Sequence, residues 1–417
     1  MIGIQELQMI VIEQAKRVVK EYEKPVKIKI NDMKETMTNS MVIDTIGYFI
    51  MVGALMIPLA LWMFLPTHTI VYWGVIIGTF VILPLLDLMA PRDKRNLDEN
   101  QMTQRKENQL YQMLPILFPI IETGMMYWAI DHYVRYVQHL SIIAKIGYYG
   151  SIGILTSALG TTIAHELFHK KSTHEKISGI YLLFLNGYSH FYVEHIWGHH
   201  KHVGTPHDTA SARKYETIYT FIPKSFVGGL CSAYRIEEKR RIKKRLPWHH
   251  NKIIQFQTIQ LLILWIIHSS FGIQGVIAFV GQAIVSIALV ECTNYIEHYG
   301  LTRKRVDPKK EVYEQVNVLH SWNATEVLTN YLLFKLQRHS DHHTYPYKRY
   351  QTLSSYDVSP QLPTGYPGMI CLSFCPPLFF YIMHPLLEKQ EERLQHVRSL
   401  KINNRTNTLT IHKQPIK

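Results

Sequence analysis

Long apolar stretches separated by short polar breaks dominate much of the chain. Four of them, covering residues 41–64, 70–90, 110–130 and 140–164, hold one charged side chain each. Because an α-helix rises about 1.5 Å per residue, about 20 apolar residues suffice to cross a hydrocarbon core of about 30 Å. Each of these stretches therefore predicts one membrane-spanning helix.

A fifth apolar stretch, residues 253–290, contains no charged side chain and is long enough for two spans. A straight helix of this length would measure about 57 Å, and Ser269, Ser270 and Gly272 provide a hinge near its middle. The pattern thus predicts an all-α integral membrane protein with six transmembrane helices arranged in three hairpins.

Basic residues indicate which side of the membrane each loop faces. They gather before residue 41, between residues 90 and 110, after residue 164, and in segments 235–245 and 303–310. The turns inside the three predicted hairpins hold a single basic residue, Arg135. By the positive-inside rule, both termini and all long loops face the cytoplasm, as in a multi-pass protein of the cell inner membrane.

The composition becomes informative once this pattern is known. The 417 residues include 45 Lys and Arg against 32 Asp and Glu, a net charge of +13. A soluble basic nucleic-acid-binding protein would have that charge, but not such long charge-free stretches between its basic clusters. Four cysteines in a chain of this length exclude a disulfide-stapled scaffold.

The chain divides into three parts. Residues 1–40 show no signal peptide and predict either an amphipathic helix on the cytoplasmic face or a solvated helical extension. Residues 41–387 form the predicted membrane domain, and residues 388–417 a polar, basic tail. The last apolar segment, 369–387, contains Pro376, Pro377 and Pro385, which favour an interfacial or re-entrant segment over a straight span.

Histidines cluster where predicted helices leave the membrane on the cytoplasmic side. The first cluster, H-E-L-F-H, begins at His165, and the second, E-H-I-W-G-H-H, begins at Glu194. On an α-helix, His195 and His199 would share one face, with His200 rotated by about 100° towards a second metal. His298 follows the last predicted span, and H-S-D-H-H begins at His339.

Together these clusters supply nine histidines, too many for one zinc ion, which takes three or four protein ligands. They suit two metal ions with four or five nitrogen ligands each. Imidazole binds iron, copper, zinc or nickel, and a dinuclear histidine-rich site beside a membrane points to oxygen-activating iron. Taken alone, the first cluster also matches the zinc metalloprotease motif.

Carboxylates near these histidines are expected to accept the second N–H of a ligand imidazole and so fix its orientation. The candidates for this role are Glu166, Glu194, Asp208, Glu297 and Asp341. His202 and His207 are expected to remain outside the ligand set.

At this point the chain resembles the bacterial integral-membrane alkane monooxygenases, within the membrane desaturase and hydroxylase superfamily. The motifs that carry the resemblance are HELFHK, EHIWGHHKHVGTPHDTASA, NYIEHYGL and LQRHSDHH. The last two are more specific than the histidine boxes, and the resemblance covers roughly residues 41–387.

The resemblance implies a non-haem di-iron enzyme that converts a terminal methyl group to a primary alcohol with O2. It implies electrons from a separate rubredoxin or ferredoxin and its NAD(P)H reductase. The ligands it implies are His165, His169, His195, His199, His200, His298, His339, His342 and His343. VGTPHDTA and the TYP after the fourth box depart from the family's commoner forms, which leaves the substrate open.

Four alternatives remain. A fatty-acyl desaturase or hydroxylase, or a xylene-type methyl monooxygenase, would share the same boxes, whereas a membrane metalloprotease or a non-catalytic metal protein would share only part of them. Cys371 and Cys375 lack rubredoxin spacing, so the electron donor is expected to be a separate acidic protein. Segments 235–245 and 303–310 would either dock that donor or only fix topology and attract anionic lipid.

Overall fold

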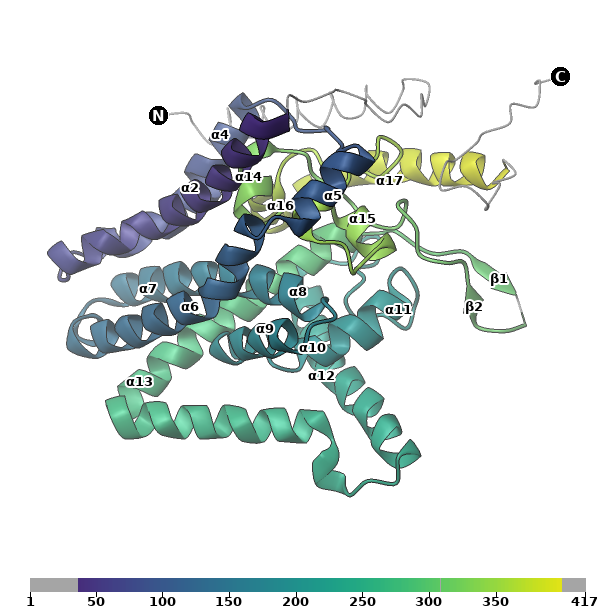
Figure 1. Cartoon of the computed structure of the whole chain (residues 1–417). Helices are drawn as coiled ribbons and strands as arrows, with labels where there is room; N and C mark the ends of the chain where they lie inside the picture. Colours follow the sequence, from purple (N-terminus) through teal and green to yellow (C-terminus); the bar gives the residue numbers. More distant parts are fainter. Residues whose placement is uncertain (1–36, 308, 400–417) are drawn as a thin grey trace.

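The computed structural model describes residues 37–307 and 309–399 (Figure 1). Nearly all of the N-terminal segment 1–40, for which an amphipathic or extended helix was predicted, lies outside these residues. Within them, five helical stretches are long and apolar enough to cross a membrane. They are Asp44–Phe64, Thr69–Met89, Glu99–His139, Ile142–Phe168 and Lys252–His298. The first four coincide with the predicted spans.

The first two stretches form an antiparallel pair. The turn between them is fixed by hydrogen bonds from Trp62 Nε1 to the Val71 carbonyl (3.0 Å) and from the Tyr72 hydroxyl to the Pro66 carbonyl (2.6 Å). The elements of this pair are α2 (Met37–Phe64), the 3-10 helix η1 (Thr69–Trp73), α3 (Gly74–Ile77), the π-helical segment η2 (Gly78–Ile82) and α4 (Leu83–Met89).

The third and fourth stretches reach the end of the molecule where the charged loops gather, which we call the polar end. Helix α5 (Glu99–Glu107) begins at a capping box formed by Asp98 and Gln101 and precedes α6 (Leu110–Arg135). After the short 3-10 helix η3 (Val137–His139), Ser141 caps the next helix. That helix runs without a break through α7 (Ile142–Leu155), the π-helical segment η4 (Thr156–Thr161) and α8 (Thr162–Phe168).

Helix α13 (Lys252–His298) has 47 residues and bends at Gly272, whose φ of 67° and ψ of −169° are not helical. This is the predicted hinge, and a positive φ favours glycine because it lacks a Cβ. The structure therefore has five helical stretches of spanning length among its described residues, and the last consists of two helices joined at the kink, with a combined length of about 70 Å. In Figure 1 its first segment lies along the lower edge and its second rises into the bundle.

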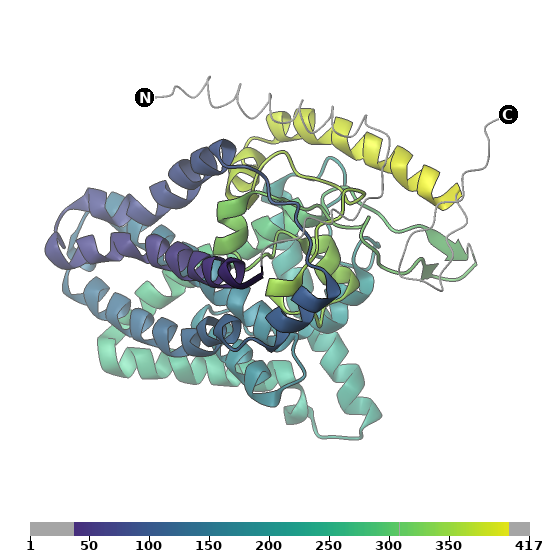
Figure 2. The same ribbon diagram turned by 45° about the horizontal axis from the view of Figure 1, so that its top comes forward.

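Shorter elements cover the polar end of these helices. They are α9 (Thr173–Leu185), α10 (Phe191–Val193), the π-helical segment η5 (Glu194–His199), α11 (His200–His202), α12 (Ile218–Lys243), the 3-10 helix η6 (Trp248–His250), α14 (Val327–Leu332), α15 (His339–Thr344) and the 3-10 helix η7 (Tyr350–Thr352). Strands β1 (Arg305–Asp307) and β2 (Val312–Tyr313) pair antiparallel and project from the body in Figures 1 and 2.

The segment after residue 365 forms two helices, α16 (Tyr366–Ser373) and α17 (Pro376–Ser399). Helix α17 begins at the Pro376-Pro377 pair and continues past residue 388, where the polar tail was predicted to start. It lies along one edge of the molecule (Figure 2). Neither helix is among the stretches long and apolar enough to span a membrane, and whether 369–387 is interfacial or re-entrant stays a prediction.

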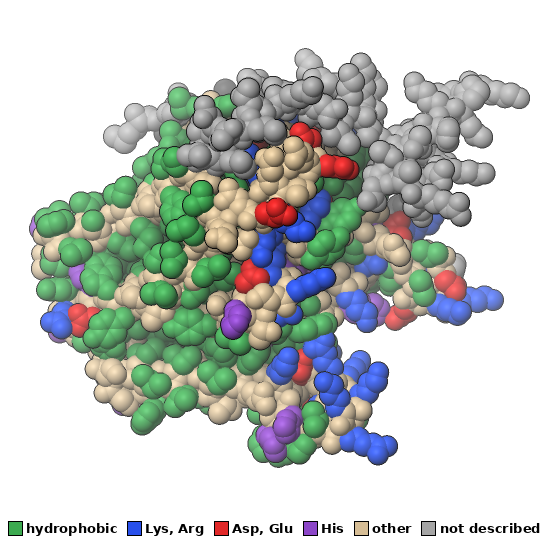
Figure 3. Space-filling model, in the orientation of Figure 1, with side chains coloured by type: hydrophobic (Ala, Val, Ile, Leu, Met, Phe, Trp, Pro, Cys, Tyr) green, Lys and Arg blue, Asp and Glu red, His purple; other side chains and the backbone are tan. Residues whose placement is uncertain are grey.

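The molecular surface separates apolar from charged regions. Hydrophobic side chains cover the long helices in Figure 3, while Lys and Arg side chains gather where α12 and the β1–β2 hairpin protrude. Ile57, Met63 and Phe64 are 67–78% exposed although they lie in a folded helix. Apolar surface of this extent is typical of lipid contact.

Candidate metal centre

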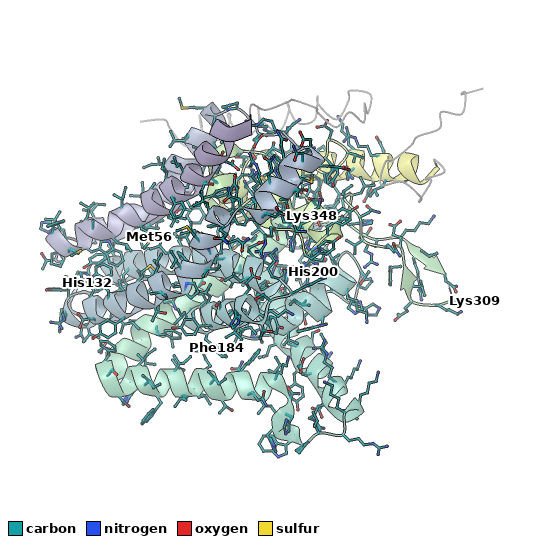
Figure 4. All side chains as sticks on the ribbon, viewed as in Figure 1. Met56, His132, Phe184, His200, Lys309 and Lys348 are labelled. Atoms are coloured by element: carbon teal, nitrogen blue, oxygen red, sulfur yellow. The ribbon has the colours of Figure 1, made fainter. Side chains whose placement is uncertain are left out.

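The structure brings all nine predicted histidines together at the polar end of the helices, in two adjacent groups. The five-histidine group consists of His165, His169, His195, His200 and His342. The four-histidine group consists of His199, His298, His339 and His343. Figure 4 marks the position of the centre by His200, at the opposite end of the helical body from His132. Within each group the candidate ligand nitrogens lie within 4.8 Å of one another.

In the five-histidine group the Nε2 atoms point inwards. His195 Nε2 lies 2.8 Å from His165 Nε2 and 2.9 Å from His200 Nε2, and His200 Nε2 lies 3.1 Å from His342 Nε2. Two nitrogens bound at right angles to one metal, at about 2.1 Å each, would be about 3.0 Å apart. The spacing therefore fits a single metal ion.

The four-histidine group has the same geometry. His343 Nε2 lies 2.9 Å from His339 Nε2 and 3.2 Å from His199 Nε2, and His339 Nε2 lies 3.2 Å from His298 Nε2. In addition, a Glu297 oxygen lies 3.2 Å from His339 Nε2. A carboxylate therefore faces the four-histidine group, whereas the five-histidine group has one more imidazole.

The prediction that His195 and His199 share one metal, with His200 turned towards the other, is wrong. On an α-helix His195 and His199 would share a face, but residues 194–199 form the π-helical segment η5. Its wider turn places residues five apart, rather than four, above one another. His195 and His200 consequently belong to the five-histidine group, and His199 points to the other group.

Burial leaves the imidazoles outside the membrane-spanning helices neutral and able to bind a metal. Burial first, and neighbouring imidazoles second, lower their pKa values well below the ordinary range. These residues are His169, His195, His200, His339, His342 and His343. His199 differs: burial alone would lower its pKa, but the charge and hydrogen bond of Asp208 raise it.

Of the five candidate carboxylates, two touch an imidazole. Asp208 Oδ2 lies 2.9 Å from His199 Nδ1, the nitrogen that faces away from the group, and Glu297 contacts His339. Asp341 instead holds its own loop, accepting hydrogen bonds from Lys348 Nζ (3.0 Å) and other groups. Those other donors are the Ser354 amide and the Tyr356 hydroxyl.

Glu166 forms an ion pair with Lys170 (2.9 Å) and accepts a hydrogen bond from the Tyr350 amide. A zinc metalloprotease would need this carboxylate beside the metal, so its placement argues against that alternative. One Glu194 oxygen has no hydrogen-bond partner. His202 and His207 lie outside both groups, as expected, and His207 pairs with Glu311 at 3.1 Å.

Sequence reasoning missed the side chain that anchors the fourth cluster. Arg338 precedes His339 and is 3% exposed, and its guanidinium donates to the Leu353 carbonyl (2.7 Å) and the Arg95 carbonyl (3.1 Å). It also pairs with Asp93 at 3.4 Å. Its adjacency to the motif was the available signal, but only the fold shows that it ties α15 to residues 93–95.

A mainly apolar cavity, about 770 Å³ when the space open to its surroundings is counted, ends at the histidines. His165 and His195 of one group and His339 of the other line it, together with Glu297 and Tyr366. Towards the membrane its walls come from η2, α7, η4, α13, α14 and α16, and include Phe80, Ile154, Ala158, Leu289, Leu332, Leu333 and Ile370. The cavity therefore joins the lipid-facing helices to both groups.

Comparison with known proteins agrees with this geometry. The fatty acid desaturase family model matches residues 147–373, which include every histidine of both groups. Alkane 1-monooxygenase 1 of Pseudomonas aeruginosa is 39% identical over 80% of this chain and 87% of its own length. Alkane 1-monooxygenase 2 of Alcanivorax borkumensis is 37% identical over 77% of this chain and 84% of its own.

A more distant relative is the hydroxylase component of the xylene/toluene monooxygenase of Pseudomonas putida. It is 26% identical over 76% of this chain and 83% of its own length. The histidine groups, the apolar helices and these similarities agree with one another. The chain is a multi-pass membrane oxidoreductase with a metal centre, and it belongs to the alkane 1-monooxygenase family.

Proposed function

We propose that this protein hydroxylates the terminal methyl group of an alkane-like hydrophobic substrate to a primary alcohol, using O2. The observation that carries the proposal is the mainly apolar cavity that connects lipid-facing helices with both histidine groups. A linear chain entering end-on from the bilayer would present its last carbon to the histidines. The names of the P. aeruginosa and A. borkumensis relatives support this substrate class.

The proposed membrane topology has six spans in three hairpins, with both termini in the cytoplasm of a cell whose inner membrane holds the protein. Helix α13, of about 70 Å, is about twice the thickness of a hydrocarbon core, and its kink at Gly272 divides it into two spans. The basic segments at the polar end support a cytoplasmic position for the histidine groups.

The proposed metal ions are two irons, one held by each histidine group. Imidazole-rich donor sets suit iron, and when bound the iron pair would supply O2 activation. Asp208 would fix the orientation of His199, and Glu297 would face the four-histidine group as a further oxygen donor. The apolar walls of the cavity would exclude water and hold the methyl group in place.

The electrons would come from a separate acidic rubredoxin or ferredoxin with its NAD(P)H reductase. Arg240 and Arg241 pair with Glu237 and Glu238 at 2.6 Å, so segment 235–245 is partly neutralised. The β1–β2 hairpin instead joins the centre through Arg303, which donates to the Lys201 carbonyl (3.0 Å) just beyond His200. We therefore favour the hairpin as the surface that binds the electron donor. The competing role for its basic residues is attraction of anionic lipid.

Binding of an acidic donor protein to the basic surface can be tested by varying the ionic strength. Raising the salt concentration should slow turnover with the protein donor and leave turnover with a small reductant unchanged. Equal salt dependence with both reductants would remove the docking role.

Two related activities remain as second candidates. The family model that matches is that of fatty acid desaturases, and a xylene/toluene hydroxylase component is among the relatives. Mass spectrometry of products from cells expressing this chain, fed n-alkanes, fatty acids and methylarenes, separates these candidates. We expect 1-alkanols from the alkanes; alkenes or benzylic alcohols as the main products would assign one of the alternatives.

A further inference from the structure

A second, much smaller cavity, with room for about one water molecule, adjoins the first at the histidines. Phe191, His195 and Asn294 line both cavities, so they form a wall between them. We call the second cavity the polar chamber after the polar side chains that lie around it, although its surface, like that of the first, is mainly apolar. Its remaining walls include Tyr188, His190, Glu194, Thr209, Ser225 and Glu291.

Several polar atoms of the polar chamber are buried without a hydrogen-bond partner. They are His190 Nε2, Glu194 Oε2 and Thr209 Oγ1. Buried polar groups in proteins are nearly always satisfied, if not by protein then by ordered water. Several unpaired polar atoms beside a small cavity are where such a water molecule is found.

Glu291 lines the chamber and contacts Asn294, one of the three residues of the wall between the two cavities. Its carboxylate is 1% exposed and accepts hydrogen bonds from the Tyr188 hydroxyl and from Asn294 Nδ2, the latter at 3.2 Å. Thr209, on the far side, is half-buried and lies against Gly228 of α12 at the polar end of the molecule. The polar groups thus extend from the buried hydroxyl of Thr209, past Glu291, to Asn294 beside the substrate cavity.

We propose that the polar chamber holds water and that Glu291 passes protons from it to the metal centre during hydroxylation. This inference rests on the proposed function, whose balance is R–H + O2 + 2 e⁻ + 2 H⁺ → R–OH + H2O. The electrons come from the external donor, and one oxygen atom of O2 leaves as water. The two protons need a route apart from the first cavity, because that cavity is mainly apolar and filled by substrate.

The test compares Glu291→Gln with Glu122→Gln. Glu122 is also a fully buried carboxyl on a long helix, but it lines neither cavity. We expect Glu291→Gln to slow alcohol formation roughly 100-fold, the lower end of what a positioned proton donor contributes, and to enlarge the solvent deuterium isotope effect. Iron content and melting temperature should stay as in the wild type. Equal rates and isotope effects in the two variants would overturn the proposal.

A second arm does not depend on turnover. A high-resolution cryo-electron microscopy map of the wild-type protein should show an ordered water molecule in the chamber, within hydrogen-bonding distance of Glu291 or Thr209, and Thr209→Val should displace it. A dry chamber would overturn the proposal even if the enzyme makes alcohol. If the wild type makes no alcohol, the proposed function fails, and this map still decides whether the chamber holds water.

Discussion

Asp208 Oδ2 lies 2.9 Å from His199 Nδ1 and so directs the opposite nitrogen, Nε2, towards the four-histidine group. Ser211 also donates to this carboxylate, at 2.6 Å, which fixes its position. Because the oriented and polarised imidazole binds metal more tightly, we expect Asp208→Asn to weaken iron binding about 10- to 100-fold.

The matched control for this variant is Asp357→Asn, since the Asp357 side chain is 49% exposed and belongs to neither histidine group. Iron per chain, measured by mass spectrometry after equilibration with a chelator of known affinity, gives the comparison. Equal iron retention by the two variants would show that Asp208 has no part in holding the metal.

The proposed substrate cavity passes Ala158 on η4. A phenylalanine there would fill part of the cavity, and a clash with a long substrate that costs about 1–3 kcal/mol, as overpacking of a core does, corresponds to about 5- to 150-fold. We expect Ala158→Phe to lower oxidation of the longest accepted alkanes by that factor and to spare shorter ones. Ala288→Phe, on α13 outside the lining, should leave the chain-length profile unchanged. Equal profiles for the two variants would exclude this path for the substrate.

The kink of α13 depends on the positive φ of Gly272. A Cβ at this position would meet no other atom, so an alanine would be opposed by backbone strain alone. We expect Gly272→Ala to lower the free energy of unfolding by about 1–3 kcal/mol. Gly53→Ala, in the regular helix α2 with equally open space, should be neutral or stabilising by up to about 1 kcal/mol. Thermal unfolding in detergent measures both, and an unaffected Gly272→Ala would contradict the kink.

Asp93 provides a prediction for acid pH. Burial alone would raise its pKa, but Arg95, Arg338 and Lys335 hold it at about 2, compared with 3.8 for a free aspartate. A folded-state pKa below the unfolded-state value stabilises the protein above about pH 4, and this contribution disappears between about pH 4 and pH 2.

We therefore expect Asp93→Asn to lower the free energy of unfolding by about 2 kcal/mol at pH 7, with the difference from wild type closing as the pH falls below about 4. Thermal unfolding of both proteins across this pH range tests it. A difference that is constant down to pH 2 would mean that the carboxylate charge is not responsible.

The spans and the histidine clusters could be predicted because both depend on local spacing. The apolar run 253–290 and its Ser269-Gly272 hinge follow from composition and the conformational freedom of glycine. The meeting of nine histidines followed from their common position at helix ends, and the structure gathers all nine.

The division of the histidines between the groups could not be predicted in the same way. It depends on the π-helical turn at 194–199, which no local propensity in E-H-I-W-G-H indicates. The pairing of Glu166 with Lys170, and of Arg338 with residues 93–95, depends on segments far apart in the chain. Spacing identifies which residues gather at a site, whereas tertiary contacts decide which partner each one finds.

The most direct test of the central claim is oxidation of an n-alkane under ¹⁸O2 by the purified protein, loaded with iron and supplied with an electron donor. The account predicts a 1-alkanol that carries one ¹⁸O atom, formed only by protein that holds about two irons per chain. An internal alcohol, an alkene, or an alcohol whose oxygen comes from water would contradict it.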